Sequence, residues 1–212
     1  MTPEIAVVDH GAGNLRSITR ALEAAGARPV ITTDPATIRA ADGIVLPGVG
    51  AACAAMTRLD DLGLTGLLRE RVASGAPFLG ICLGMQLLFG HQEEGDTEGL
   101  GVLRGRVRML APGVKIPQIG WNAVRATGDG PLGPAGTEDD FYFVHSYVVD
   151  GADPADVAGV TRYGEAFPSV VARGHVWGTQ FHPEKSSGAG LNLVRAWVEM
   201  VRDTVSAKAG AA

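Results

Sequence analysis

The chain has 212 residues, of which 46% are hydrophobic and 19% charged, and its net charge is −5. This is an ordinary globular composition, and the length suffices for one sizeable core, which predicts a single domain. Because Lys and Arg are few and scattered, the sequence excludes the basic surface of a nucleic-acid-binding protein. No basic segment precedes the first apolar run, and glycines interrupt the longest one, so we expect no signal peptide, no membrane span and a cytoplasmic location.

The first half of the chain alternates short apolar runs with helical patterns. Apolar spacing at Leu15, Ile18 and Leu22 predicts a helix that Gly26 ends, and the spacing from Leu62 to Val72 predicts another. Such alternation predicts right-handed βαβ units and a parallel sheet with helices on both faces. The predicted strands are 4–9, 29–33, 42–46 and 76–81.

Beyond residue 100 the pattern changes to β-type segments. Arg173-Gly174 indicates a hairpin turn, 191–201 has the spacing of a last amphipathic helix, and 206–212 has the composition of a disordered tail. We therefore predict one α/β domain over 1–205. It has a mostly parallel central sheet flanked by helices, in three flavodoxin-like layers, with a C-terminal antiparallel β extension. The β-type segments are 103–110, 120–126, 140–149 and 169–180.

One of the two cysteines has the setting of a nucleophile. Cys82 lies in Gly80-Ile-Cys82-Leu-Gly84, between a predicted strand and a helical pattern that reaches Phe89. Two glycines at such a junction permit the strained turn that exposes a reactive side chain, and the helix N-terminus favours a thiolate. The alternative is a small buried hydrophobe, which is the interpretation we favour for Cys53.

A thiolate nucleophile needs a base and a group that orients the base. His182 follows a predicted strand in Phe181-His182-Pro-Glu184, where Pro183 fixes the backbone and Glu184 can turn back to the imidazole. The spacing does not suit metal ligation on a helix, so we expect no metal and no cofactor. A coincidental surface histidine is the alternative.

The turn Gly80-Ile-Cys82-Leu-Gly84 and the run Phe181-His182-Pro-Glu184 together resemble the motifs of the class I, triad-type glutamine amidotransferases. Further motifs resemble the glutaminase subunits of imidazole glycerol phosphate synthase, which act in histidine biosynthesis, and they cover nearly the whole chain. These motifs are Asp9-x-Gly-x-Gly-Asn-Leu15, Pro47-Gly-Val-Gly50, Pro117-Gln-Ile-Gly-Trp-Asn122, Tyr142-Phe-Val-His-Ser-Tyr147 and Phe181-His-Pro-Glu-Lys-Ser-Ser187. His10 and Ala52 depart from the family pattern, in which a tyrosine and an aromatic residue are usual.

The resemblance implies roles for individual residues. Cys82 would attack the carboxamide of L-glutamine, His182 would transfer protons and Glu184 would hold the imidazole. The backbone N–H of Leu83, and a second N–H from a peptide at Val49 or Gly50 that rotates when the partner is loaded, would stabilise the oxyanion. The glycines at 48 and 50 could instead only form a turn. Glutamine would be recognised by Gln86, Glu94, Ser146 and Tyr147, whereas composition alone favours solvated polar residues, with His145 a satisfied core histidine.

The family logic also requires a partner, because free ammonia is lost if it escapes. The resemblance implies a heterodimer with a (β/α)₈ cyclase that receives the ammonia and makes imidazole glycerol phosphate and AICAR. The interface residues that we expect are Asn14, Gln118, Trp121 and Lys185. Trp121 is the best anchor of these, although a core tryptophan is the alternative.

Three other functions remain open at the level of sequence. Gly11-Ala-Gly13 between a strand and a helix, with Asp34 about twenty residues further on, partly matches a dinucleotide-binding module, but Arg16 replaces its third glycine. The same elbow could serve a cysteine hydrolase that acts alone, such as a peptidase or thioesterase. A glutaminase subunit of a different synthase is the third.

Overall fold

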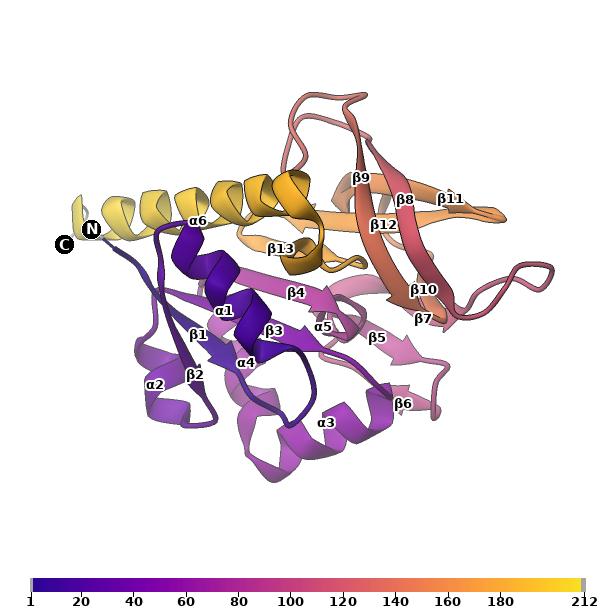
Figure 1. Cartoon of the computed structure of the whole chain (residues 1–212). Helices are drawn as coiled ribbons and strands as arrows, with labels where there is room; N and C mark the ends of the chain where they lie inside the picture. Colours follow the sequence, from indigo (N-terminus) through magenta and orange to yellow (C-terminus); the bar gives the residue numbers. More distant parts are fainter. Residues whose placement is uncertain (1, 211–212) are drawn as a thin grey trace.

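The computed structural model describes residues 2–210, apart from the side chains of 208 and 209, and is built on a nine-stranded sheet (Figure 1). Its first five strands are parallel to one another, and each later strand is antiparallel to its neighbour. In sheet order the strands are β2 (Arg28–Thr32), β1 (Glu4–Val8), β3 (Gly43–Gly48), β4 (Phe78–Cys82), β13 (Val176–Thr179), β12 (Glu165–Arg173), β11 (Val157–Tyr163), β8 (Gln118–Ala126) and β9 (Glu138–His145).

A second, four-stranded sheet lies beside the cysteine turn. Its strands, in order, are β10 (Tyr147–Asp150), β7 (Leu103–Met109), β5 (Phe89–Gln92) and β6 (Thr97–Glu98). It pairs β10 and β7 antiparallel and β7 and β5 parallel. The chain passes from β9 of the large sheet directly to β10 of the small one at Ser146, so this residue lies at the junction of the two sheets.

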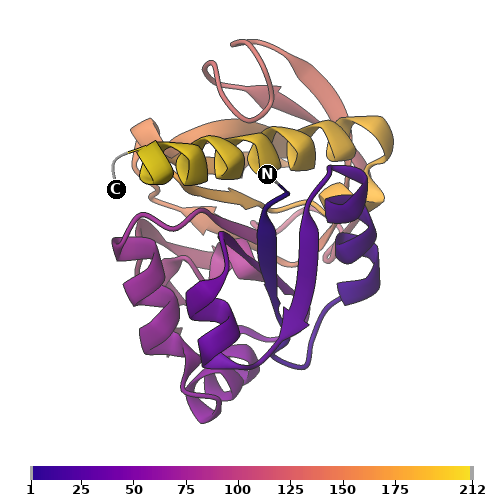
Figure 2. The same cartoon turned by 90° about the vertical axis from the view of Figure 1, so that its left-hand side faces the viewer.

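Helices cover both faces of the parallel part (Figure 2). On one face lie α1 (Leu15–Ala24) and α6 (Ser187–Gly210), and on the other lie α2 (Pro35–Ala40), α3 (Ala52–Asp61) and α4 (Leu64–Ala73). β1 shows why two cores form: Ile5 and Val7 pack with α1 and α6, whereas Ala6 and Val8 pack with the other three helices. All four side chains are fully buried, as expected for a central parallel strand. One-turn elements complete the chain: α5 (Leu83–Gln86), η1 (Pro154–Asp156) and η2 (Pro183–Lys185).

The predicted α/β class, with its flanked sheet and antiparallel extension, is confirmed. Several details differ from the prediction. The helix after Cys82 ends at Gln86 rather than Phe89, because the chain turns there into β5. Segment 140–149 is split between two sheets, and β11 was not predicted.

The last helix is longer than the sequence indicates. α6 runs from Ser187 to Gly210 and so includes residues 206–210, for which we expected disorder, so that part of the prediction is wrong; residues 211 and 212 lie outside the described residues. The boundary of the single domain remains a prediction. Among the described helices, none combines the length and the apolar character that crossing a membrane requires.

Candidate active site

Three parallel strands end together at one edge of the large sheet, and the motif residues follow them. β4 lies between β3 and β13, with Cys82 opposite Gly48 and Ile81 opposite Thr179. β13 ends at Thr179, and His182 is the third residue after it. The carboxyl ends of parallel strands are where α/β proteins place their ligands. The topology therefore brings residues a hundred positions apart to one edge.

Cys82 occupies a strained turn. Its backbone angles are φ 53° and ψ −108°, a combination that L-residues rarely adopt and that persists where the surrounding structure enforces it. A Cβ at Gly84 would lie 1.7 Å from the carbonyl oxygen of Leu46, and one at Gly80 would lie 2.5 Å from that of Gly84. Both glycines are thus required by close backbone approach, as a nucleophile elbow demands.

The helix behind Cys82 is only one turn long. It spans Leu83–Gln86, so a helix dipole can contribute little to the site. What remains is the local effect of the first N–H groups, which have no intrahelical acceptor. The N–H of Leu83, directly after the cysteine, is the first of these.

His182 and Glu184 form a buried pair. The Nδ1 atom of His182 lies 2.8 Å from Oε1 of Glu184, and each side chain is 4% exposed. Burial by itself would lower the pKa of His182, but hydrogen bonding with Cys82 and with Glu184, together with their charges, raises this pKa to about 9. The imidazole is therefore cationic at neutral pH.

The sulfur of Cys82 lies between a donor and an acceptor. Gln180 Nε2 donates toward Sγ, and the thiol can donate to the carbonyl oxygen of Val144, each over 3.8 Å. Among the described residues, the Nε2 atom of His182 has no hydrogen-bond partner of regular geometry, although Cys82 contributes most to raising the pKa of this imidazole. The ring nitrogen not used by Glu184 is thus left for the sulfur and its reaction.

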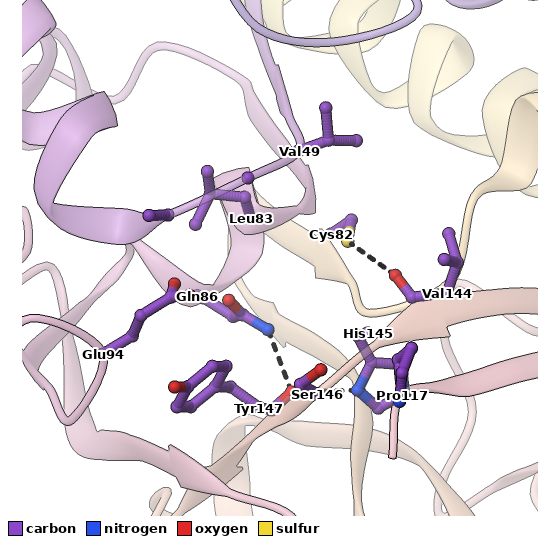
Figure 3. Close-up of a pocket in the computed structure, with 12 residues that line it drawn as sticks. Val49, Cys82, Leu83, Gln86, Glu94, Pro117, Val144, His145, Ser146 and Tyr147 are labelled. Carbon is purple, nitrogen blue, oxygen red and sulfur yellow. Dashed lines mark hydrogen bonds between the residues drawn. The ribbon is translucent and has the colours of Figure 1, made fainter. Parts of the chain in front are cut away.

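A cavity of about 350 Å³ opens beside the sulfur (Figure 3). All four residues predicted to recognise glutamine line it, together with the three predicted oxyanion residues. In Figure 3, Glu94, Gln86 and Tyr147 lie on one side, and Val144 and His145 on the other. The complete lining is Val49, Gly50, Ala51, Cys82, Leu83, Gln86, Glu94, Pro117, Val144, His145, Ser146 and Tyr147.

Gln86 links Tyr147, in the cavity lining, to Gln180, which contacts the sulfur of Cys82. Its Nε2 donates to the carbonyl oxygen of Tyr147 and to Oε1 of Gln180, each over 3.0 Å. Gln180 in turn donates toward Cys82, and it is fully buried. We did not predict Gln180, although alternation in an extended segment places it on the same side as His182, two residues later.

The turn after β3 lies on the other side of Cys82. Val49 is 41% exposed, and Gly50 has φ +90°, a conformation that favours glycine. A Cβ at Gly48 would lie 3.0 Å from that of Leu83, so the turn packs directly on the residue after the nucleophile. The predicted oxyanion residues are therefore adjacent in space.

His145 is a core histidine that also lines the cavity. Its Nδ1 lies 2.9 Å from the carbonyl oxygen of Tyr147, and the residue is 6% exposed. Burial lowers the pKa of His145 to about 4, against the effect of this hydrogen bond, and the nearby His182 lowers it further. At neutral pH, His145 is therefore uncharged, whereas His182 is cationic.

Three of the four predicted interface residues lie on the surface, and Gln118 does not. Trp121 is 51% exposed and packs edge-on against Tyr142, with ring centroids 6.1 Å apart. The Nζ atom of Lys185 lies 5.8 Å from the centroid of the Tyr142 ring. Asn14 is exposed and is the N-cap of α1, and this helix packs against η2. Gln118 is fully buried and donates to Asn122, so the prediction of a surface role for its side chain is wrong. It alternates with exposed Ile119 on β8 and faces inward.

Asp34 has a structural use that weakens the dinucleotide-binding alternative. Its carboxylate accepts from the N–H groups of Ala36 and Thr37 and caps α2. A Cβ added at Gly13 would lie 3.8 Å from Pro47 Cβ and from the backbone nitrogen of Gly48, so this glycine faces the end of β3 rather than an open phosphate site. Within residues 2–210, no group of three His, Cys, Asp or Glu side chains is arranged to hold a metal ion.

The fold and this geometry define an α/β protein with the site of a cysteine-dependent hydrolase: a thiol on a strained strand-to-helix turn beside a buried His–Glu pair. The family described as Glutamine amidotransferase class-I matches residues 6–198. The chain is 48% identical to the imidazole glycerol phosphate synthase subunit HisH of Symbiobacterium thermophilum, over 96% of this chain and 97% of that protein. The subunit of the same name from Synechococcus elongatus is 49% identical, over 94% of each chain.

Solved structures share the fold at lower identity. A crystal structure of a glutamine amidotransferase superposes with a TM-score of 0.74 at 22% identity, over 93% of this chain and 98% of that one. The structure of PurLQS from Thermotoga maritima superposes with a TM-score of 0.73 at 19% sequence identity, over 97% of this chain and 100% of that one. The chain therefore belongs to the class I glutamine amidotransferases and, within them, to the HisH subunits of imidazole glycerol phosphate synthase.

Proposed function

We propose that this chain is the glutaminase subunit of imidazole glycerol phosphate synthase. It hydrolyses L-glutamine to glutamate and ammonia, and the ammonia passes to a partner cyclase in histidine biosynthesis. The observation that carries the proposal is the strained backbone of Cys82, at φ 53°, beside the buried His182–Glu184 pair. The near-full-length similarity to HisH subunits supplies the reaction and the pathway. The cytoplasm is its proposed location, which suits a chain whose two described cysteines are both free thiols.

The reaction begins with the thiolate of Cys82. Sγ attacks the carboxamide carbon of glutamine, and the carbonyl electrons move to oxygen to give a tetrahedral oxyanion. The imidazolium of His182 gives its proton to the nitrogen, the C–N bond breaks, and ammonia and a glutamyl thioester result. A pKa of about 9 supports the role of His182, because the ring then holds this proton at neutral pH.

Hydrolysis of the thioester restores the enzyme. The neutral imidazole takes a proton from water, whose oxygen attacks the thioester carbon, and the C–S bond breaks to release glutamate and the thiolate. Glu184 holds the ring in one tautomer throughout, which its 2.8 Å contact to Nδ1 supports. Both steps develop an oxyanion, for which the N–H of Leu83 and an N–H at Val49 or Gly50 are the proposed donors. One such donor contributes roughly 10²–10³ in rate.

Glutamine recognition falls to residues that line the cavity. Glu94 would pair with the substrate ammonium, and Gln86, Ser146 and Tyr147 would contact the remaining polar groups. Burial raises the pKa of the Tyr147 hydroxyl, and the charge of Glu94 raises it further. Both side chains line the same side of the cavity (Figure 3), which supports a shared role.

The proposed partner is a (β/α)₈ cyclase bound as a heterodimer. Trp121 is exposed on β8, and Ile119, two residues earlier on the same strand, pairs with the cavity residue Val144, which supports a docking site next to the cavity. Asn14 and Lys185 extend this proposed interface.

Replacement of the nucleophile tests the function. Cys82→Ala should abolish glutamine-dependent synthesis by the complex while leaving synthesis from added ammonia intact. The matched control Cys53→Ala changes the other cysteine, which the structure exposes although the sequence led us to expect it buried, and should keep both activities. Glutamine-dependent synthesis that survives Cys82→Ala would sink the proposal. Glutamate release that does not rise on addition of the loaded cyclase would favour a hydrolase that acts alone.

A further inference from the structure

The segment 47–52, which contains the end of β3, the turn after it and the first residue of α3, is held at each end by a side chain from a distant part of the chain. At its entry, Nε2 of His10 lies 2.8 Å from the carbonyl oxygen of Pro47. At its exit, the carboxylate of Glu94 accepts a 3.0 Å hydrogen bond from the N–H of Ala52, the first residue of α3. A turn that only joins a strand to a helix needs neither contact.

The contact at the entry is tight and has a defined direction. A carbonyl oxygen only accepts hydrogen bonds, so Nε2 of His10 carries the proton. The ring is 4% exposed, and its other nitrogen, Nδ1, has no partner within the described chain. A Cβ at Gly48 would lie 3.2 Å from Nε2 and 3.0 Å from Leu83 Cβ. Gly48 is therefore packed tightly between the imidazole of His10 and Leu83, whose N–H is one of the proposed oxyanion donors.

The contact at the exit replaces a missing helix cap. The N-cap of α3 is Ala51, whose side chain cannot accept a hydrogen bond, and Glu94 supplies the acceptor from 42 residues away in the sequence. This bond uses only Oε2 of the carboxylate. Glu94 also lines the cavity, so its other oxygen is available to a cationic group bound there.

Between its two fastened ends the turn is open. Val49 is 41% exposed, and a Cβ at Gly50 would meet no described atom within 4 Å. Packing thus restrains the peptides next to Pro47 and Ala52 but not the peptide between Val49 and Gly50. This is the peptide whose N–H is the proposed second oxyanion donor.

We propose that His10 and Glu94 are positioning residues that clamp the two ends of this turn, so that rotation is confined to the peptides around Val49 and Gly50. The inference rests on the proposed function, which gives the turn its role in stabilising the oxyanion. We call the contact of His10 with Pro47 the entry clamp and that of Glu94 with Ala52 the exit clamp. Loss of the entry clamp misplaces the proposed oxyanion donor at Val49 or Gly50, which lowers kcat rather than raising KM. Glu94 also contacts the substrate, so its two roles should separate by kinetics.

Two substitutions test the entry clamp in the complex of this chain with the loaded cyclase. His10→Phe keeps a ring of similar size but removes the donor, and should lower kcat for glutamate release about 10- to 100-fold with KM within about twofold. His10→Gln keeps an N–H that can reach Pro47 and should recover most of that loss. An unchanged kcat in His10→Phe, or equal losses in both variants, would overturn the entry clamp.

Glu94 offers an independent test with a different readout. Glu94→Gln keeps an oxygen for the N–H of Ala52 but removes the charge, so KM for glutamine should rise while kcat stays within about threefold of the unmodified complex. Glu94→Ala removes both contacts, and kcat should then fall about tenfold as well. Identical kcat values in the two variants would refute the exit clamp, and this pair decides the matter if His10→Phe does not fold. Failure of the proposed function is a different result, because it appears as glutamine use that survives Cys82→Ala.

Discussion

At the scale of single residues, the site is organised around one cation and one neutral ring. His182 has a raised pKa because Cys82 and Glu184 outweigh its burial, whereas His145 has a lowered pKa because burial dominates. Two histidines in one site thus take opposite charge states, set by their neighbours rather than by residue type. A neutral His145 adds no positive charge that would compete with the proton on His182.

The charge of His182 predicts an alkaline limit to activity. Its pKa is raised to about 9, so the ring is protonated below that pH and loses, as pH rises through about 9, the proton that departing ammonia needs. We expect kcat/KM for glutamate release by the loaded complex to fall above that pH, with a parallel titration of the His182 ring by NMR.

The variant Glu184→Gln provides the control. A neutral amide stabilises the imidazolium less than a carboxylate does, so the alkaline fall should begin at lower pH. The amino group of glutamine titrates equally with both enzymes, so only the difference between their profiles reports on His182. Superimposable profiles would show that Glu184 does not hold the charge of this imidazole.

At the scale of elements, the strained turn depends on two glycines that have no room for a side chain. A Cβ at Gly84 would lie 1.7 Å from the carbonyl oxygen of Leu46, a backbone atom that cannot rotate away. Gly84→Ala should therefore lower the free energy of unfolding by about 3 kcal/mol or more, as measured by denaturant titration.

A glycine in an ordinary helix provides the comparison. Gly66 lies within α4 with no described atom within 4 Å of an added Cβ, so Gly66→Ala should stabilise the protein by roughly 0.5–1 kcal/mol. A Gly84→Ala variant as stable as Gly66→Ala would mean that the turn is looser than its contacts imply.

The elements that the sequence predicted well are those with strong local signals. After Glu4, strand β1 is an uninterrupted apolar run, and α1 has clear apolar spacing and a stop at Gly26. The one-turn α5 was predicted too long because apolar residues continue from Leu87 to Phe89 into β5. Periodicity cannot distinguish a buried helix from a buried strand over so few residues.

The site was predictable where chemistry forces a motif and not where contacts are long-range. The elbow glycines and the His-Pro-Glu run carry their own signals in sequence. The contact of Gln180 with Cys82 and that of His10 with Pro47 join segments 98 and 37 residues apart, and no local pattern indicates them. Gln118 was misplaced because its motif suggests exposure, whereas the strand register turns it inward.

At the scale of the whole molecule, the two halves of the large sheet supply different parts of the site. The parallel half provides Cys82 and the turn at Pro47, and β13, at the border with the antiparallel half, leads to His182. The antiparallel half adds the exposed face of β8 and β9. On that face Ile119 is 59% and Trp121 51% exposed, opposite Val144 and Tyr142 respectively. Tyr142 also accepts, through its carbonyl oxygen, the N–H of His182.

This arrangement predicts that Trp121 anchors the partner. An exposed indole next to Tyr142 offers a large rigid apolar surface, and such residues dominate interface energies. Trp121→Ala should weaken binding to the cyclase by about 2 kcal/mol, or roughly 30-fold in Kd by calorimetry, with little change in Tm because the side chain is half exposed. The control Ile31→Ala removes a side chain of 44% exposure on β2, far across the sheet from β8, and should leave Kd unchanged. Equal binding by both variants would place the docking surface elsewhere. A fall in Tm confined to Trp121→Ala would instead assign the indole a structural role.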